Sequence, residues 1–104
     1  MPAESITVTF YDECSDEDVD NAMARLVPQA PNPLIRNVTT TPEKFGSVNR
    51  AYIECLRDNA ILIAMQRAMI AAQPCEKVFT IDTDHSPFYS APEELAALLL
   101  QLAQ

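Results

Sequence analysis

Residues 77–88 read KVFTIDTDHSPF and contain the only histidine of the chain, His85. The first five residues form a short apolar, β-branched run, which predicts a strand that reaches residue 81. A helix is expected soon after the histidine, because Ser90 and Glu93 have the spacing of a capping box ahead of an apolar run. Strand, histidine loop and helix therefore follow one another. This order places an imidazole on a loop between rigid elements, where binding and catalytic groups are over-represented.

The same kind of unit occurs once more, earlier in the chain. Residues 50–56, RAYIECL, predict a mostly apolar strand that ends at Asp58 and Asn59, and residues 61–73 predict a helix. The order after residue 46 is thus strand, helix, strand, helix. Two strands joined by a crossover helix are expected to lie parallel, with a right-handed connection. Parallel strands rarely occur as an isolated pair, so this architecture calls for more sheet than the chain supplies.

Apolar residues at helical spacing are expected to pack both helices against this sheet. They are Ile61, Met65, Ala68, Met69 and Ala72 in the first helix, and Leu95, Leu98, Leu99 and Leu102 in the helix expected over residues 92–103. The methionines are also compatible with a promiscuous binding groove, but core packing is the simpler interpretation.

The residues before the first predicted strand are less regular. Residues 6–10, ITVTF, alternate in polarity and predict a short strand or extended arm, and residues 16–27 predict a helix with Ser15 as its cap. Prolines within residues 28–33 mark an irregular connection in which helix is not expected. Residues 42–46 predict a single helical turn. The acidic run over residues 12–20 is compatible with a metal-binding patch, but a solvated helix face is the more common role of such runs.

Composition excludes several classes of function. The chain has 104 residues, 48% of them hydrophobic, which fits a single globular unit. A net charge of −8 argues against a nucleic-acid or anionic-membrane partner, and no apolar stretch approaches the length of a membrane span. Gly46 is the only glycine, so the G-x-S-x-G elbow, the P-loop and the G-x-G-x-x-G fingerprint are all absent from this sequence.

Three cysteines, Cys14, Cys55 and Cys75, are expected to be reduced and mostly buried in a cytoplasmic protein, because their number is odd and no secretory signal precedes them. A zinc site built from cysteines and His85 is an alternative, although the spacing does not favour it.

Asp58 and His85 each follow the carboxyl end of a predicted strand, at the sheet edge where functional groups of parallel sheets gather. Their separation of 85 − 58 = 27 residues is what one strand–helix–strand unit consumes, so the two side chains can meet. An aspartate that accepts a hydrogen bond from one imidazole nitrogen leaves the other as a general base. The alternative is a structural loop histidine, with Asp82 or Asp84 paired to an arginine or lysine.

The chain resembles the C-terminal part of α/β-hydrolases. The resemblance is carried by residues 43–55, by Asp58, by Gln66-Arg67 and by Asp84-His85, and residues 14–18 look like part of a cap. The nearest branch contains the plant methyl-ester esterases and hydroxynitrile lyases, with bacterial esterase relatives.

This resemblance implies a partial α/β-hydrolase fold of the α/β class, with a cap segment and linker over residues 1–41 and a β-α-β-α core with two parallel strands over residues 42–104. It implies that Asp58 is the acid and His85 the base of a Ser-His-Asp triad. No cofactor and no metal are expected. The nucleophile and oxyanion hole precede these elements in the fold, and the chain is expected to begin too late to contain them. Three serines of interest lack the context of a nucleophile: Ser47, Ser86 and Ser90.

The expected function is ester hydrolysis, by a chain that carries the acid and base but no nucleophile. Hydroxynitrile lyases of this branch carry a lysine after the histidine, where this chain has Ser86, so lyase chemistry is the less favoured reading. The expected partner is a small-molecule ester, bound when an N-terminal half completes the fold. The alternative is a remnant protein without catalysis, whose apolar faces are buried in a homo-oligomer.

Overall fold

The computed structural model describes residues 2–104; Met1 lies outside the described part. Its elements are α1 (Ala3–Phe10), α2 (Asp16–Arg25), α3 (Asn32–Ile35), the 3₁₀ helix η1 (Phe45–Ser47), β1 (Ala51–Cys55), α4 (Ile63–Ala72), β2 (Lys77–Ile81), α5 (Pro87–Ser90) and α6 (Pro92–Leu102). Within these residues, no helix combines the length and the apolar character that a bilayer crossing requires.

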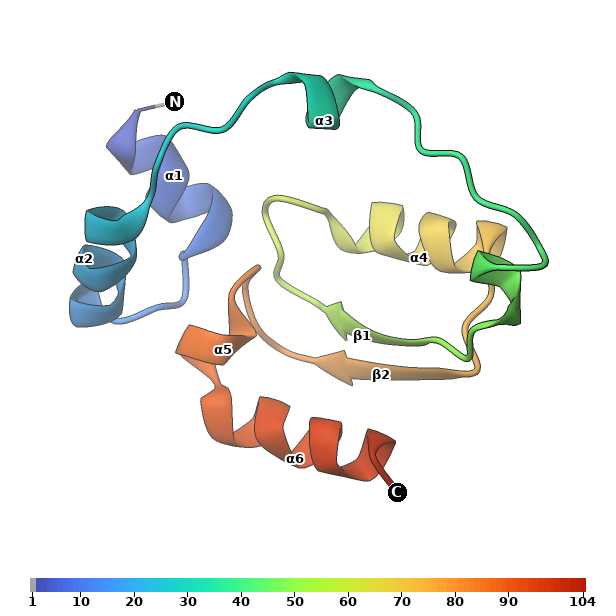
Figure 1. The fold of residues 1–104 in the computed structure, drawn as a ribbon. Helices are drawn as coiled ribbons and strands as arrows, with labels where there is room; N and C mark the ends of the chain where they lie inside the picture. The colour runs from blue at the N-terminus through green and yellow to red at the C-terminus, as the bar shows by residue number, and fades with distance from the viewer. Residues whose placement is uncertain (1) are drawn as a thin grey trace.

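β1 and β2 form the expected parallel pair, in register from Ala51 beside Lys77 to Cys55 beside Ile81. α4 connects them and lies beside β1, whereas α6 follows β2 and lies on the opposite side of the strand pair (Figure 1). Both strands run toward the end of the molecule where α1, α2 and α5 lie. The loops that follow the strands therefore face the N-terminal helices, and this contact builds the site described below.

The strand predicted over residues 6–10 is wrong, because these residues lie in α1. Alternation over five residues is a weak signal, and neighbouring structure overrides it. In the helical form Ile6 and Phe10 are four residues apart and share one face, and the hydroxyl of Thr7 donates to the carbonyl of Ala3 at 3.1 Å.

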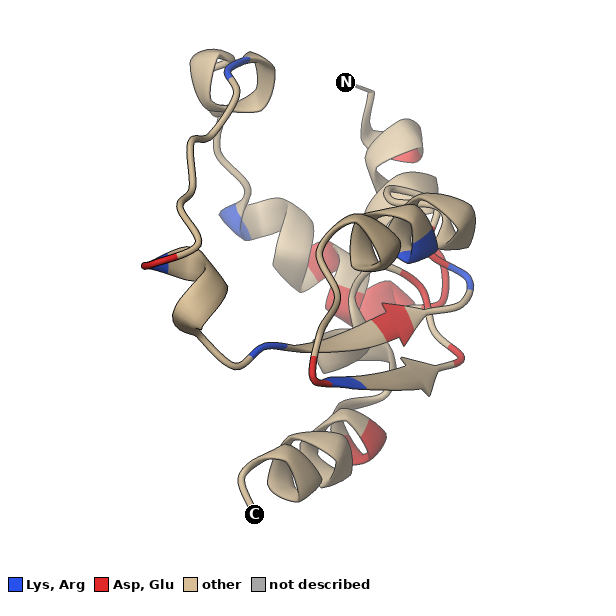
Figure 2. Cartoon of the chain, turned by 90° about the vertical axis from the view of Figure 1, so that its right-hand side faces the viewer, with Lys and Arg blue, Asp and Glu red and all other residues tan. Residues whose placement is uncertain are grey.

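α2 has the predicted cap, since the Ser15 hydroxyl accepts a hydrogen bond from the Asp18 N–H at 3.2 Å. Its acidic first turn complements the positive end of the helix dipole. Figure 2 shows acidic positions through α2 and in the loops after the strands, whereas Lys and Arg are few and scattered. Asp16, Glu17 and Asp20 are exposed, which fits a solvated helix face.

Three smaller expectations need correction. The proline-rich connection contains the four-residue helix α3, which starts with prolines at positions that tolerate them. The turn predicted over residues 42–46 is shifted to η1, although the Thr41 hydroxyl still accepts from the Lys44 N–H at 3.3 Å. Ser90 does not cap α6; it ends α5, and its hydroxyl donates to Asp84 at 2.9 Å.

The described residues bury little apolar surface. Ala22, Ile81 and Pro87 are the only buried apolar residues among them, whereas several buried side chains are polar. The expected packing of the α4 methionines is wrong for this chain: Met65 is 58% and Met69 is 42% exposed. A two-stranded sheet offers α4 one line of contact, and the opposite face of the helix has nothing to pack against.

Candidate active site

Asp58 lies in the loop directly after β1 and its side chain is nearly buried, with 5% exposure. The oxygen Oδ1 accepts hydrogen bonds from the N–H groups of Ala60 at 2.7 Å and Ile61 at 2.9 Å. These two bonds fix the carboxylate in an Asx-type turn. The other oxygen, Oδ2, is thereby aimed away from its own loop.

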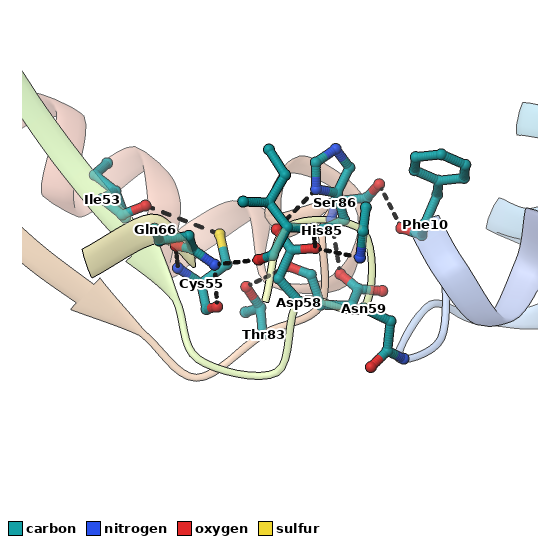
Figure 3. A network of polar contacts seen from close by, with 12 residues as sticks. Phe10, Ile53, Cys55, Asp58, Asn59, Gln66, Thr83, His85 and Ser86 are labelled. Carbon is teal, nitrogen blue, oxygen red and sulfur yellow. Dashed lines mark hydrogen bonds and ion pairs between the residues drawn. The ribbon is translucent and has the colours of Figure 1, made fainter. Parts of the chain in front are cut away.

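His85 lies in the loop after β2, and its Nδ1 is 2.7 Å from Oδ2 of Asp58 (Figure 3). The carboxylate can only accept, so Nδ1 carries the shared proton and the neutral ring keeps Nε2 as an acceptor. The His85 side chain is 33% exposed, and the ring of Phe10 meets it edge-on with centroids 5.4 Å apart. The structure thus brings together the two residues that the sequence pairs, as expected from their places after parallel strands.

Asp84 is fully buried beside His85 and accepts four hydrogen bonds. Oδ2 accepts from the Glu13 N–H at 2.9 Å and the Cys14 thiol at 3.3 Å, and Oδ1 accepts from the Ser86 N–H and the Ser90 hydroxyl, both at 2.9 Å. Burial alone raises the pKa of this carboxyl, but the hydrogen bonds outweigh it and lower the pKa below its usual value.

The alternative in which Asp84 pairs with a basic residue is therefore wrong. That role falls to Asp82, whose Oδ1 is 3.0 Å from Nε of Arg57. Asp84 instead connects the histidine loop to Glu13 and Cys14, two hydrogen-bond donors about 70 residues earlier in the chain.

The three cysteines are free and partly buried, in line with the expected reduced state. Burial, followed by the hydrogen bond to Asp84 and the charge of that carboxylate, raises the pKa of the Cys14 thiol to about 12. Cys14 is thus a hydrogen-bond donor at neutral pH and a poor nucleophile. Among residues 2–104, no three His, Cys, Asp or Glu side chains are grouped so that they could hold a metal ion.

The N-terminal segment is tied to both loops of the site. The Ser86 hydroxyl donates to the carbonyl of Phe10 at 2.7 Å (Figure 3). The Asn59 side-chain amide donates to the carbonyl of Val8 at 2.9 Å. Arg57 adds an ion pair with Glu13 at 2.8 Å, although both side chains are largely exposed and such pairs contribute little. α1 is thereby held over the Asp58–His85 pair.

Next to this pair, a surface hollow of about 400 Å³ opens between α1 and the residues after α2. Five of the six residues that line it are apolar or aromatic: Ile6, Phe10, Tyr11, Leu26 and Val27, with Gln29 as the sixth. Phe10 belongs both to this lining and to the contact with the His85 ring. His85 itself does not line the hollow, so Phe10 is the residue that connects the hollow with the imidazole.

The three serines considered from the sequence as nucleophiles all donate their hydroxyl protons to other groups. Ser86 donates to Phe10, Ser90 donates to Asp84, and Ser47 donates to the Lys44 carbonyl at 2.6 Å, far along the chain from the histidine loop. Their bonds serve loop structure, as the sequence context indicates.

Sequence reasoning missed three residues of the site: Asp84 as a buried acceptor, Gln66 and Phe10. For Asp84 a signal existed, because an aspartate two residues before a serine in a loop is typical of an Asx turn. For Gln66 the signal was a polar residue between Ile63 and Ile70, the face of α4 that turned out to be inward. Nothing local marked Phe10, since its contact depends on residues far along the chain.

Sequence comparison places the chain among plant esterases, although no family model matches it. It is 42% identical over 98 residues to putative methylesterase 11, chloroplastic, of Arabidopsis thaliana, and 38% identical over 89 residues to methylesterase 7 of the same plant. The alignments cover 91% and 85% of this chain. It spans only 25% and 34% of the length of these two relatives.

Structure comparison leads to the same group. The crystal structure of polyneuridine aldehyde esterase superposes on 99% of this chain with a TM-score of 0.90 at 26% sequence identity, and the match takes up 42% of that enzyme. The two-stranded parallel unit with its helices is thus part of a larger α/β fold. The chain belongs to the α/β-hydrolase superfamily, in the branch of the plant methylesterases, and corresponds to a C-terminal portion of its members.

Proposed function

We propose that the chain supplies the acid and the base of a serine-type carboxylic ester hydrolase, with Asp58 as the acid and His85 as the base. The observation that carries the proposal is the 2.7 Å contact between Oδ2 of Asp58 and Nδ1 of His85, at the carboxyl ends of two parallel strands. Kinship with methylesterases supports this reading over a structural histidine. In α/β-hydrolases the acid also precedes the histidine along the chain, as it does here.

In this mechanism the nucleophile comes from a segment outside this chain. Nε2 of His85 takes the proton of that serine hydroxyl while the serine oxygen attacks the ester carbonyl. The imidazolium, stabilised by Asp58, then returns the proton to the leaving alcohol. Water hydrolyses the acyl-serine through the same base, which restores both side chains to their starting protonation states.

Residues 1–41 serve as the cap segment and linker of this enzyme, and residues 42–104 as the C-terminal part of its core. The bonds from Ser86 to Phe10 and from Asn59 to Val8 support this division, because they hold α1 over the two catalytic loops. The apolar hollow between α1 and residues 26–29 then forms part of the wall that receives the ester. A small, largely apolar ester is the substrate that such a wall suits.

Ester hydrolysis fits the residue after the histidine better than cyanohydrin cleavage does. A lyase of this branch needs a positive charge there, whereas the chain has Ser86, whose hydroxyl is buried and engaged with the Phe10 carbonyl.

Complementation tests the proposal. The chain is assayed on p-nitrophenyl acetate alone and together with the N-terminal portion of a related methylesterase that contains the nucleophile serine. We expect hydrolysis only in the mixture, lost in His85→Ala and reduced roughly 10³-fold or more in Asp58→Asn. The matched control is Asp20→Asn, an exposed aspartate of α2, which should hydrolyse like the unmodified chain. Hydrolysis that persists in His85→Ala would refute the assignment, as would a stable but inactive complex.

Apolar exposure favours a second candidate function, that of an oligomerising protein without catalysis. Four large apolar side chains are each more than half exposed: Leu62 just before α4, Met65 in α4, and Leu99 and Leu100 in α6. A homo-oligomer would cover such faces. Light scattering after size exclusion distinguishes the candidates: a stable oligomer that neither hydrolyses esters nor binds the N-terminal portion favours the second, and a monomer rejects it.

A further inference from the structure

Gln66 is a polar residue on α4 that is only 1% exposed, and its amide uses all of its usual bonding groups. Oε1 accepts from the Cys55 N–H at 2.9 Å, while Nε2 donates to the carbonyls of Cys55 at 2.9 Å and Ile61 at 2.8 Å (Figure 3). The orientation of the amide follows from these partners, because a flipped amide would set two donors against each other at the Cys55 N–H.

These bonds close the loop that carries Asp58. Cys55 is the last residue of β1 and Ile61 lies two residues before α4, so one side chain grips both ends of the loop. Inside it, the N–H groups of Ala60 and Ile61 hold Oδ1 of Asp58, which leaves Oδ2 for His85. Both backbone groups of Ile61 are thus hydrogen-bonded: its carbonyl accepts from Gln66 and its N–H donates to Asp58.

We propose that Gln66 is a positioning residue for the Asp58–His85 pair, acting through the loop from Cys55 to Ile61. Its catalytic consequence rests on the proposed function, but the positioning itself does not. The side chain keeps the loop in the one shape in which the carboxylate meets Nδ1 of His85, and it does so without touching either residue's reacting atoms.

The Gln66 amide also prevents a neighbouring strand from pairing with β1 at Cys55. The Leu56 N–H bonds to the Ile81 carbonyl, so by alternation the N–H and C=O of Cys55 point away from β2. Gln66 occupies both groups as a neighbouring strand would. Any strand that pairs with the outer edge of β1 must therefore end before Cys55, which leaves room for the loop of Asp58 at that edge.

A purely structural role for Gln66 makes a different prediction. If the amide only satisfied buried backbone groups, its loss would lower the unfolding temperature but leave the Asp58–His85 contact intact in the molecules that remain folded. Positioning predicts that the contact loosens in the folded molecules themselves.

NMR on the whole chain separates the two roles. Gln66→Met keeps the length of the side chain and removes its hydrogen bonds, Gln101→Met is the matched control at an exposed position of α6, and Asp58→Asn shows how the spectrum changes when the pair is lost. In Gln66→Met we expect the His85 ring nitrogens to lose the Nδ1–H tautomer preference, and the Ala60 and Ile61 amides to exchange about tenfold faster or more. Gln101→Met should change neither. An unchanged tautomer in folded Gln66→Met would overturn the proposal.

A measurement on the unmodified chain keeps the proposal falsifiable when Gln66→Met does not fold, because positioning requires the hydrogen bonds of Gln66 to persist in solution. The Nε2 protons of Gln66 should exchange with solvent far more slowly than those of Gln101, and hydrogen-bond couplings should connect them to the Cys55 and Ile61 carbonyls. Equal exchange rates would overturn the proposal. Since no readout involves hydrolysis, an inactive complemented enzyme would reject the triad assignment and leave the role of Gln66 standing.

Discussion

At the scale of single residues, Asp84 is the clearest example of a buried charge that the fold uses. A carboxylate without water is costly unless donors surround it, and here four donors do so. Two of them belong to Glu13 and Cys14, so this one side chain joins the N-terminal segment to the loop of His85.

Replacing Asp84 by Asn should destabilise the chain markedly. The amide keeps the shape of the side chain, but its NH₂ group must face N–H, O–H or S–H donors on whichever side it lies. We expect a loss of about 2 kcal/mol in the free energy of unfolding, or a fall in Tm of roughly 10 °C by thermal melting at pH 7. Asp20→Asn, at an exposed position of α2, should melt like the unmodified chain.

The difference between the Asp84→Asn variant and the unmodified chain should also depend on pH. The folded pKa of Asp84 lies below the unfolded value, so the native state binds fewer protons than the unfolded state. The contribution of the Asp84 carboxylate to the free energy of unfolding is therefore fully present above about pH 4. It is lost as the pH falls through the folded pKa. The two melting curves should therefore converge in acid, and a constant gap down to pH 2 would contradict the assignment of the charge.

Cys14 provides a chemical probe of the same contact. With a thiol pKa of about 12, it is almost entirely protonated at pH 8 and should react with iodoacetamide at least roughly a hundredfold more slowly in the folded than in the unfolded chain. Peptide mass mapping over time measures this rate. After burial, the Asp84 carboxylate is the next largest cause of the raised pKa of the Cys14 thiol. Asp84→Asn removes this carboxylate and should therefore speed the reaction. An unchanged rate would show that burial alone protects the thiol.

Residues differ in how far sequence can locate them. Asp58 and His85 were predictable as a pair, because each follows a parallel strand and one crossover separates them. Asp84 and Gln66 carried only weak local signals, and these did not reveal which backbone groups their side chains would bind. The donor of Glu13 lies 71 residues from Asp84, and no local pattern encodes that approach.

At the scale of elements, β1, β2, α4 and α6 were predicted to within two residues, whereas α1 was assigned the wrong type and α5 was not predicted. β1 and β2 carry continuous apolar or β-branched runs, and the Ser15 cap marks the start of α2. α1 has neither a side-chain cap nor a fully buried residue, so its sequence alone barely distinguishes helix from strand. The element depends instead on the bonds that its carbonyls at Val8 and Phe10 accept from the site loops.

The cap of α2 gives a prediction at this scale. Ser15→Ala leaves the Asp18 N–H without its partner and should lower the free energy of unfolding by about 1 kcal/mol, or the Tm by roughly 5 °C. Ser5→Ala inside α1, at an exposed position, is the matched control and should stay within about 0.5 kcal/mol of the unmodified chain. Equal melting curves for both variants would mean that α2 unfolds separately from the transition that is observed.

At the scale of the whole molecule, the dominant feature is the imbalance between a well-bonded polar site and a small apolar core. The site is held by hydrogen bonds within the described residues, but only three apolar residues among them, Ala22, Ile81 and Pro87, are buried. The chain matches only 42% of a solved esterase, and we propose that the remainder of such a fold would cover the exposed apolar faces. The sequence predicts the same imbalance, because it contains only two strands of a parallel sheet, and parallel pairs rarely occur alone.

The apolar face of α4 tests this explanation. Met65 is 58% exposed and borders a hollow with Ile61 and Leu62, whereas Met69 is 42% exposed and borders a second hollow with Phe45 and Tyr52. If the N-terminal portion of an esterase packs there, the double substitution Met65→Gln and Met69→Gln should leave the unfolding of the isolated chain within about 0.5 kcal/mol, because exposed positions contribute little. Binding to the N-terminal portion, measured by calorimetry, should weaken at least roughly tenfold, since buried methionines are worth more than 1 kcal/mol each. Val38→Gln, in the exposed linker, is the control. Equal affinity for the double variant would show that this face stays in water, and that the completed enzyme packs against the chain elsewhere.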